Sequence, residues 1–136
     1  MKIMLDTNVL ISAFVFRGRV RKIFDMLFEK NFELYVSEYV DKEFKRILNV
    51  KWSARADEIY SLYRSLNFVF CSSTSETLCH LRDEKDIPVL SDAIYHGVDI
   101  LLTGDKDFIE SEIKTPKIIS PSELFENFLW KGFFYG

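Results

Sequence analysis

Three aspartates stand next to short apolar runs of the kind that form buried strands: Asp6, Asp86 and Asp105. Asp6 closes the first run, Asp105 follows a later one at residues 99–103, and Asp86 opens the helical segment that leads into that later run. Ligand sites in parallel sheets lie beyond the carboxyl ends of the strands, so we expect all three carboxylates on one rim. A lone carboxylate at the end of a buried strand is expensive to ionise without a partner. The placement therefore favours a group of acids that share a cation.

Glu43 adds a fourth carboxylate, at the edge of a helix face formed by Val40, Phe44 and Ile47. Converging acids repel each other unless a cation neutralises them, and hard divalent ions such as Mg²⁺ or Mn²⁺ take oxygen ligands while keeping several waters. Such an ion activates water and stabilises charge on a phosphoryl group. The set predicts metal-dependent phosphodiester hydrolysis, with four catalytic candidates: Asp6, Glu43, Asp86 and Asp105.

Each acid also has a structural interpretation. Asp86 fits the start of a helix, where carboxylates are favoured. Asp105 fits a turn or cap, and Glu43 fits a solvated helix edge. Asp6 is the hardest to explain in this way, because its strand is expected to be central and buried.

The elements that must position these acids alternate along the chain. Strands are expected at residues 2–6, 33–37, 67–71, 99–103 and 117–120. Helices are expected at residues 19–30, 38–48, 52–66 and 86–97, and from Ser120 onward, where Ser120 and Glu123 fit a capping box. Strands that alternate with helices indicate βαβ crossovers and a parallel sheet covered on both faces, which is an α/β fold with three layers, α/β/α.

Composition bounds the class of protein. The chain has 136 residues, 48% hydrophobic and 29% charged, which is typical of one globular domain over residues 1–136. It contains no apolar run long enough to span a bilayer, and the charge at Asp6 interrupts any signal-peptide core, so we expect a cytoplasmic protein with no membrane partner. Two cysteines and two histidines are too few for a disulfide framework or a zinc site: Cys71, Cys79, His80 and His96.

Charge is distributed unevenly. The net charge of -3 argues against a protein that coats nucleic acid by bulk attraction. However, residues 17–55 hold ten Lys/Arg against six Asp/Glu, whereas residues 74–136 hold six against twelve. The densest basic stretch could contact the phosphates of a nucleic acid or could be a solubilising start of a helix: Arg17, Arg19, Arg21 and Lys22.

Four segments in order resemble the motifs of the PIN domain family, a nuclease fold. Residues 3–12 (IMLDTNVLIS) resemble the first motif and carry Asp6, and residues 37–48 (SEYVDKEFKRIL) are similar to the second and carry Glu43. Residues 82–94 (RDEKDIPVLSDAI) resemble the third motif, with Asp86, and residues 101–108 (LLTGDKDF) the fourth, with Asp105. Residues 118–125 (IISPSELF) match the closing strand and helix, so the resemblance covers nearly the whole chain.

The resemblance implies a five-stranded parallel sheet of order 3-2-1-4-5 and a ribonuclease dependent on Mg²⁺ or Mn²⁺. By this resemblance the metal ligands would be Asp6, Asp86 and Asp105, and Glu43 would complete the site directly or through water. Three residues would support it: Asn8, Thr103 and Asp107. Two further acids lie near the third motif, of which Asp83 is the stronger rival and Asp92 the weaker, because Asp92 lies deep inside the helix.

The resemblance is strongest to PIN domains described as toxin components of prokaryotic toxin–antitoxin systems. It implies an RNA substrate, an antitoxin partner and a homodimer or higher homo-oligomer. The aromatic tail at residues 128–135 would either fold onto the core or form an interface.

Two other functions compete with a nuclease. A receiver-like phosphoacceptor domain is also doubly wound, but it needs an acid pair after the first strand and an acceptor aspartate after the third, where this chain has Thr7 and Cys71-Ser-Ser. A PIN domain could also serve only as a binding module for RNA or protein, although four intact acids argue against that role.

Overall fold

The computed structural model describes residues 1–105, 108 and 113–129, excluding the side chains of 128 and 129. Within this part of the chain, five parallel strands form one sheet of order β3-β2-β1-β4-β5. The strands are β1 (Lys2–Leu5), β2 (Glu33–Ser37), β3 (Val69–Cys71), β4 (Ile100–Leu102) and β5 (Lys117–Ile119). The predicted fold class and strand order are both confirmed.

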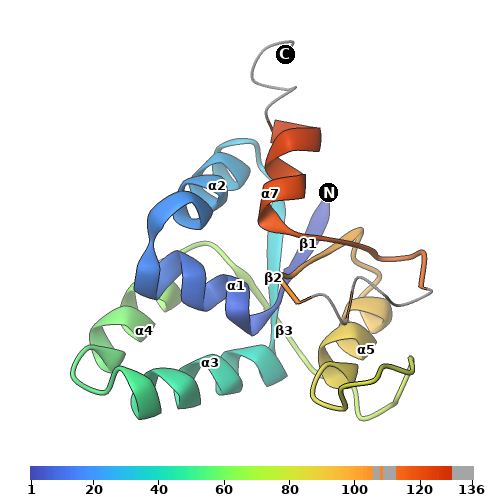
Figure 1. The fold of residues 1–136 in the computed structure, drawn as a ribbon, viewed down its shortest axis with the longest axis horizontal. Coiled ribbons are helices and arrows are strands. Elements are labelled where there is room, and N and C mark those ends of the chain that lie inside the picture. Colours follow the sequence, from blue (N-terminus) through green and yellow to red (C-terminus); the bar gives the residue numbers. More distant parts are fainter. Residues whose placement is uncertain (106–107, 109–112, 130–136) are drawn as a thin grey trace.

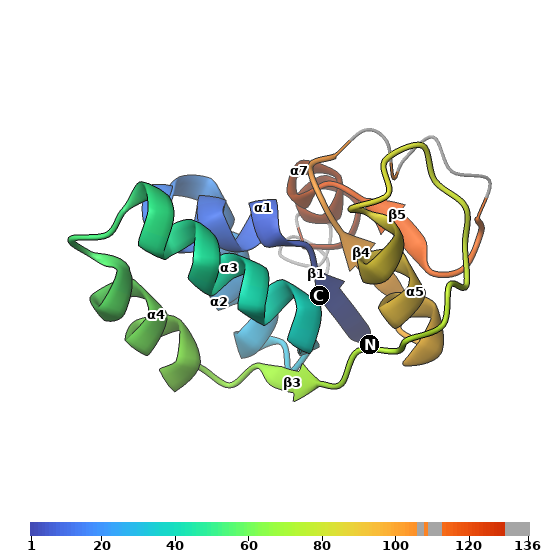
Figure 2. The ribbon, with the colours of Figure 1, turned by 90° about the horizontal axis from the view of Figure 1, so that it is seen from below.

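Helices lie on both sides of this sheet (Figures 1 and 2). They are α1 (Thr7–Ile11), a π-helical turn η1 (Ser12–Phe16), α2 (Gly18–Glu29), α3 (Glu38–Lys51), α4 (Ala56–Ser65), α5 (Ile87–Tyr95), α7 (Pro121–Leu124) and a second π-helical turn η2 (Phe125–Leu129). In Figure 2, helices α1 to α4 gather on one side of β1, whereas α5 lies with β4 and β5 on the other. None of the described helices combines the length and the apolar character that crossing a membrane requires.

Strand β1 occupies the centre of the sheet. Ile3 is in register with Leu34 of β2 on one side and with Ile100 of β4 on the other. Ile3, Met4 and Leu5 are fully buried, which explains why this strand reads as a continuous apolar run rather than an alternating one. The topological switch point, where ligand sites form in such sheets, therefore lies at the end of β1.

Aromatic rings fill much of the core beneath α1 to α4. Phe44 of α3 stacks on Tyr63 of α4 with ring centroids 4.8 Å apart. Phe14 of η1 packs against Tyr63 at 5.6 Å and edge-on against Phe68 at 6.0 Å. This packing fixes α3, which carries Glu43, against the segment that follows β1.

The helical segment directly after β1 departs from the sequence analysis, which assigned no element to residues 7–18. Thr7, Val9, Leu10, Ala13 and Phe14 are all buried there. The segment is short and apolar residues are dense in it, so no clear periodicity of 3.6 residues stands out. Its N-cap is Asp6, whose carboxylate accepts a hydrogen bond from the Thr7 N–H.

Smaller departures concern the ends of elements. Helix α3 runs three residues beyond the predicted end at 48, and α4 begins at Ala56 rather than at 52, because Trp52 caps α3 and a turn follows it. Strand β3 begins at Val69 rather than 67. The capping box is confirmed: the Glu123 N–H donates to Ser120 Oγ at 3.2 Å. Residues 130–135 of the aromatic tail lie outside the described residues.

Candidate active site

Asp6 is held by two donors from different elements. Its Oδ1 accepts the Thr7 N–H at 2.8 Å, and its Oδ2 accepts the Thr103 hydroxyl at 2.8 Å. The backbone N–H of Asp6 also donates to the Leu102 carbonyl at 3.0 Å. Asp6 is 6% exposed, so the carboxylate is fixed at the end of β1. Each of its oxygens keeps one lone pair for a further partner.

Asp86 occupies the N-cap position of α5 but does not act as a cap. Its side chain makes no capping hydrogen bond, and its backbone is already helical at φ -84° and ψ -20°. Its Oδ2 is buried and has no hydrogen-bond partner, although the carboxyl does share a hydrogen bond with Asp105. Asp86 therefore does lie at the start of a helix, as its structural interpretation expects, but its side chain does not bond the first N–H groups of that helix.

One cavity of about 200 Å³ brings the four candidate acids together. Asp105 extends from the segment after β4, where its N–H donates to Thr103 Oγ1 at 3.0 Å. Glu43 projects from α3 on the opposite side. The cavity is lined by Asp6, Thr7, Asn8, Ile11, Glu43, Ile47, Asp83, Lys85, Asp86, Val89 and Asp105.

The cavity acids perturb one another. Burial raises the pKa of Asp6 to about 6, and the charges of Glu43 and Asp105 add to this rise against the opposing bonds from Thr103 and Thr7. Burial also raises the pKa of Asp86 to about 7, helped by the charges of Asp105, Asp6 and Asp83 and by the hydrogen bond with Asp105. Burial and mutual repulsion both disfavour the charged forms of Asp6 and Asp86, and a cation placed among these acids would offset both effects.

The donor set fits a hard divalent cation that keeps part of its water shell. Among the described residues, no three His, Cys, Asp or Glu side chains lie close enough together to hold a metal ion by themselves. However, the free lone pairs of Asp6 and the unpartnered Oδ2 of Asp86 are oxygen donors without a protein partner. Mg²⁺ is commonly held by one or two carboxylates while it keeps several of its own waters, so the oxygens of Asp6 and Asp86 suit it.

The supporting residues tie α1 to the segment after β4. The Gly104 N–H donates to Asn8 Oδ1 at 3.3 Å, and Thr103 bonds both Asp6 and the Asp105 N–H. Asp107, the third predicted supporting residue, lies outside the described residues.

The two rival acids differ in position. Asp83 lines the cavity, and its Oδ1 accepts the Lys85 N–H at 3.0 Å. Asp92 is completely buried in α5 and does not line the cavity; its Oδ1 accepts the Thr74 N–H at 2.7 Å. Asp92 therefore anchors the connection between β3 and α5.

None of the four basic residues predicted to contact RNA lines the acidic cavity. Two of them pack on rings: the Arg19 guanidinium lies 4.9 Å from the centroid of Phe125, and Arg21 lies 5.1 Å from that of Phe14. Arg21 also pairs with Asp25 at 3.4 Å, whereas Arg17 and Lys22 are exposed.

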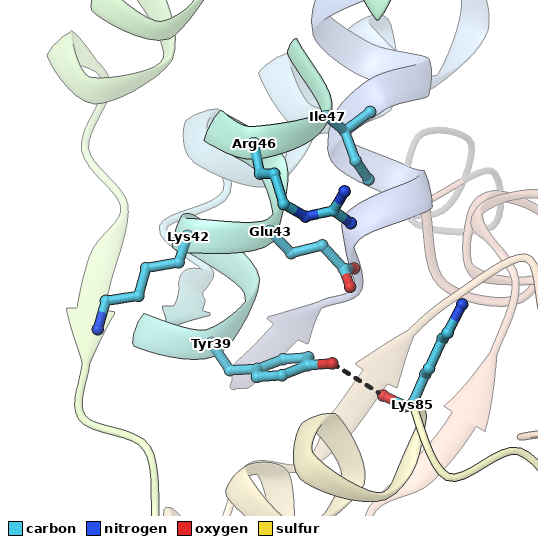
Figure 3. A pocket seen from close by; sticks show the side chains of 6 residues that line it. All are labelled: Tyr39, Lys42, Glu43, Arg46, Ile47 and Lys85. Atoms are coloured by element: carbon cyan, nitrogen blue, oxygen red, sulfur yellow. Dashed lines mark hydrogen bonds between the residues drawn. The ribbon is translucent and has the colours of Figure 1, made fainter. Parts of the chain in front are cut away.

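Sequence reasoning missed a second group of cations beside the acids. Figure 3 shows a groove next to the cavity, lined by Tyr39, Lys42, Glu43, Arg46, Ile47 and Lys85. Two signals could have found it: Arg46 lies one helical turn after Glu43, and Lys85 immediately precedes Asp86.

The histidines and cysteines take no part in the cavity. His96 Nε2 lies 2.6 Å from the Ser72 carbonyl oxygen, and His80 is exposed. Both cysteines are free, and burial raises the pKa of the Cys71 thiol to about 11.

Comparison with known proteins gives two kinds of match. The family model of the PIN domain matches residues 2–107. Among solved structures, the chain is similar to VapBC2 from Rickettsia felis bound to a DNA fragment from its promoter, with a TM-score of 0.72, 16% identity, and coverage of 88% of this chain and 98% of that one. It is also similar to Mycobacterium tuberculosis VapC20, a toxin that cleaves the sarcin–ricin loop, with a TM-score of 0.59, 16% identity, and coverage of 79% and 92%. No curated protein sequence matches the chain.

Proposed function

Because this chain belongs to the PIN domain family, we propose that it is a metal-dependent endoribonuclease that hydrolyses RNA phosphodiester bonds in the cytoplasm. The observation that carries this proposal is the cavity in which Asp6, Glu43, Asp86 and Asp105 meet, where the buried Oδ2 of Asp86 has no hydrogen-bond partner. VapC20, which has a similar fold, is a toxin that cleaves RNA at the sarcin–ricin loop, and this supports RNA as the substrate.

In this proposal Asp6, Asp86 and Asp105 are the ligands of a Mg²⁺ or Mn²⁺ ion together with its bound waters, and Glu43 contacts the ion directly or through water. When bound, the ion activates water and stabilises charge on the scissile phosphate. Thr103 and the Thr7 N–H orient the Asp6 carboxylate, and Asn8 holds the Gly104 main chain that leads to Asp105. Orientation of this kind lets the acids act without reorganising during the reaction.

The same proposal makes this chain the toxin of a toxin–antitoxin pair. The similar VapBC2 structure contains such a complex, which supports an antitoxin as the protein partner. A homodimer or higher homo-oligomer remains a prediction of the sequence analysis.

Cleavage of RNA by the wild type and by Asp6→Asn, both supplemented with Mn²⁺, tests the proposal. We expect Asp6→Asn to lower the rate by about 100-fold or more, as for other groups that stabilise charge during the reaction. Asp57→Asn is the matched control, because Asp57 is exposed on α4, away from the cavity, and its replacement removes the same charge. Equal cleavage by the wild type and Asp6→Asn would refute the catalytic assignment and would favour a module that only binds RNA or protein.

Soaking a crystal in Mn²⁺ provides an independent measurement. We expect anomalous density among Asp6, Asp86 and Asp105. Density centred on Asp83 alone, or on Asp92, would overturn the choice of ligands.

A further inference from the structure

A groove of about 570 Å³ runs beside the acidic cavity and is continuous with it. The two share Glu43, Ile47 and Lys85 in their walls. One wall is α3 and the other is the segment just before α5 (Figure 3). A substrate that reaches the acids from this side must therefore lie along the groove.

Arg46 and Lys85 give the groove two positive charges that form no ion pair in the described part of the chain. Both side chains are exposed, and neither forms an ion pair within 4.0 Å in that part of the molecule. Arg46 points to the same side of α3 as Glu43, and the Lys85 side chain rises from the facing segment (Figure 3). Two unpaired cations thus face each other across an open groove.

Lys42 lines the same groove but has a different position. Its Nζ lies 3.0 Å from Glu38 Oε1, and its side chain points away from Arg46 and Lys85 (Figure 3). Its charge is already matched by an acid one turn earlier. Replacement of Lys42 therefore serves as a control, because it removes one positive charge from the same region without removing an unpaired cation.

Tyr39 adds an aromatic ring to the groove. Its hydroxyl donates to the Lys85 carbonyl oxygen at 3.4 Å, so the ring reaches from α3 to the facing segment below Glu43 (Figure 3). The ring is only half buried, and one side of it lines the groove. Aromatic side chains in this setting stack on bases of single-stranded nucleic acids without sequence preference.

The pattern of charge matches an RNA backbone better than a neutral ligand. The acidic cavity repels phosphates, so a strand held across it needs cations on the flanking phosphates. Arg46 and Lys85 are the groove's cations without an acidic partner, and they flank the acids directly.

We propose that this groove is a subsite for a nucleotide of single-stranded RNA next to the scissile bond, with a phosphate bound by Arg46 and Lys85 and the base or ribose packed on Tyr39. The inference rests on the proposed function, because it describes where the RNA substrate of that function binds. Phosphate contacts position a strand without reading its sequence, so the subsite provides affinity rather than base specificity.

Binding of a fluorescent single-stranded RNA oligonucleotide tests the subsite. It is measured by anisotropy in the Asp6→Asn protein, which does not consume the probe, over a range of salt concentrations. We expect Arg46→Gln with Lys85→Gln to weaken binding about tenfold or more at low salt and to reduce the slope of log K against log salt by about 0.7, because the contact with one phosphate is lost. Lys42→Gln should change the affinity by less than about twofold, as expected for an exposed charge already paired on the helix.

The ring of Tyr39 is tested by two substitutions. Tyr39→Leu should weaken binding about fivefold or more because it removes the stacking surface. Tyr39→Phe retains the ring, removes only the bond to Lys85, and should bind like the parent protein.

Cleavage kinetics separate this inference from the proposed function. In the otherwise wild-type enzyme, the double substitution should raise KM about tenfold and leave kcat within about twofold, because it removes binding common to the ground and transition states. If the wild type cleaves RNA but the double substitution alters neither KM nor the salt slope, or if Lys42→Gln has an equal effect, the subsite is refuted and the function stands. If the wild type binds RNA through this groove but cleaves none, the subsite stands and the function is refuted. If the wild type neither binds nor cleaves RNA, both are refuted.

Discussion

Helix α3 carries two acids that have opposite surroundings, although only Lys42 separates them. Asp41 accepts hydrogen bonds from the hydroxyls of Tyr60 at 3.0 Å and Tyr63 at 2.7 Å, and it pairs with Arg64 at 3.6 Å. Glu43 faces other carboxylates across the acidic cavity. Positions two residues apart point about 200° away from each other on a helix, so the two acids belong to different faces.

Asp41 stabilises the fold because hydroxyl donors satisfy its charge, whereas Asp86 in the acidic cavity keeps a buried oxygen without a hydrogen-bond partner. The Asp41 group consists of Asp41, Tyr60, Tyr63 and Arg64, and its negative charge is satisfied by the chain's own donors, which join α3 to α4. Burial and the bond to Asp41 raise the pKa of Tyr63 well above its ordinary value, so this hydroxyl stays a donor. In the acidic cavity, burial and the charges of neighbouring carboxylates raise the pKa values of Asp6 and Asp86, and a bound cation would relieve that repulsion.

Replacing Asp86 by Asn should have the largest effect and should separate activity from stability. We expect the rate of RNA cleavage to fall by about 100-fold or more. The melting temperature at pH 8 should stay the same or rise, because the substitution removes repulsion between Asp86 and its neighbours Asp105 and Asp6. Calorimetry and a cleavage assay on the same preparation check both results. A clear drop in melting temperature would mean that Asp86 is a structural residue like Asp41.

Replacing Asp41 by Ala should give the reverse pattern. The hydroxyl of buried Tyr63 loses its acceptor, so we expect unfolding in urea to show a loss of about 2 kcal/mol. Cleavage per folded molecule should remain close to that of the wild type. The control is Arg64→Gln, which removes a half-exposed partner and should cost less than about 1 kcal/mol. If Arg64→Gln proved as damaging as Asp41→Ala, the ion pair rather than the tyrosine bonds would hold α3 on α4.

The smallest predicted effect is a pH dependence of stability that comes from the cavity alone. Because the pKa of Asp6 is raised from 3.8 to about 6, the folded state binds more protons than the unfolded state between these values. The free energy of unfolding should therefore rise as pH falls from 8 to 5, by an amount on the order of 1 kcal/mol. Melting curves in EDTA measure this rise in the free energy of unfolding. The rise should be smaller in Asp6→Asn than in the wild type, and Asp57→Asn should show the same rise as the wild type. A fall in melting temperature from pH 8 to pH 6.5 in EDTA would contradict the raised pKa.

The sequence was sufficient to predict those parts of the fold whose hydrophobic patterns are locally clear. Strand β2 matches its predicted bounds, and α2 begins and ends within one residue of the prediction. The segment from Thr7 to Phe16 could not be predicted in this way, because its helical turns are stabilised by burial of Phe14 and Leu10 against distant elements rather than by local propensity.

The residues of the candidate site also fall into two groups: those that the sequence predicted and those that only the structure revealed. The four acids follow from strand ends and motif spacing, and the structure places them in one cavity, although their catalytic roles remain a prediction. Arg46 and Lys85 were not identified as a pair, because they lie far apart in the chain and only the fold brings them to one groove, although each stands near a predicted acid in the sequence. The conspicuous run from Arg17 to Lys22 has two members packed on aromatic rings. A dense run of basic residues in the sequence therefore does not by itself locate cations that are free to bind a ligand. The fold decides which basic side chains lie together without an ion pair.

The two walls of the acidic cavity should differ in how readily their backbone amides exchange with solvent. The wall at Asp6 belongs to the central strand, hydrogen-bonded to β2 and β4, so its amides exchange only when much of the sheet opens. The wall at Asp83 and Lys85 belongs to residues 72–86, which contain no helix or strand. Side-chain hydrogen bonds such as those to Asp92 and Ser91 hold that segment in place of a sheet, so we expect its amides to exchange faster than those of β1. In the proposed complex with RNA, the wall that carries Lys85 would adjust to the substrate while the Asp6 carboxylate keeps its position.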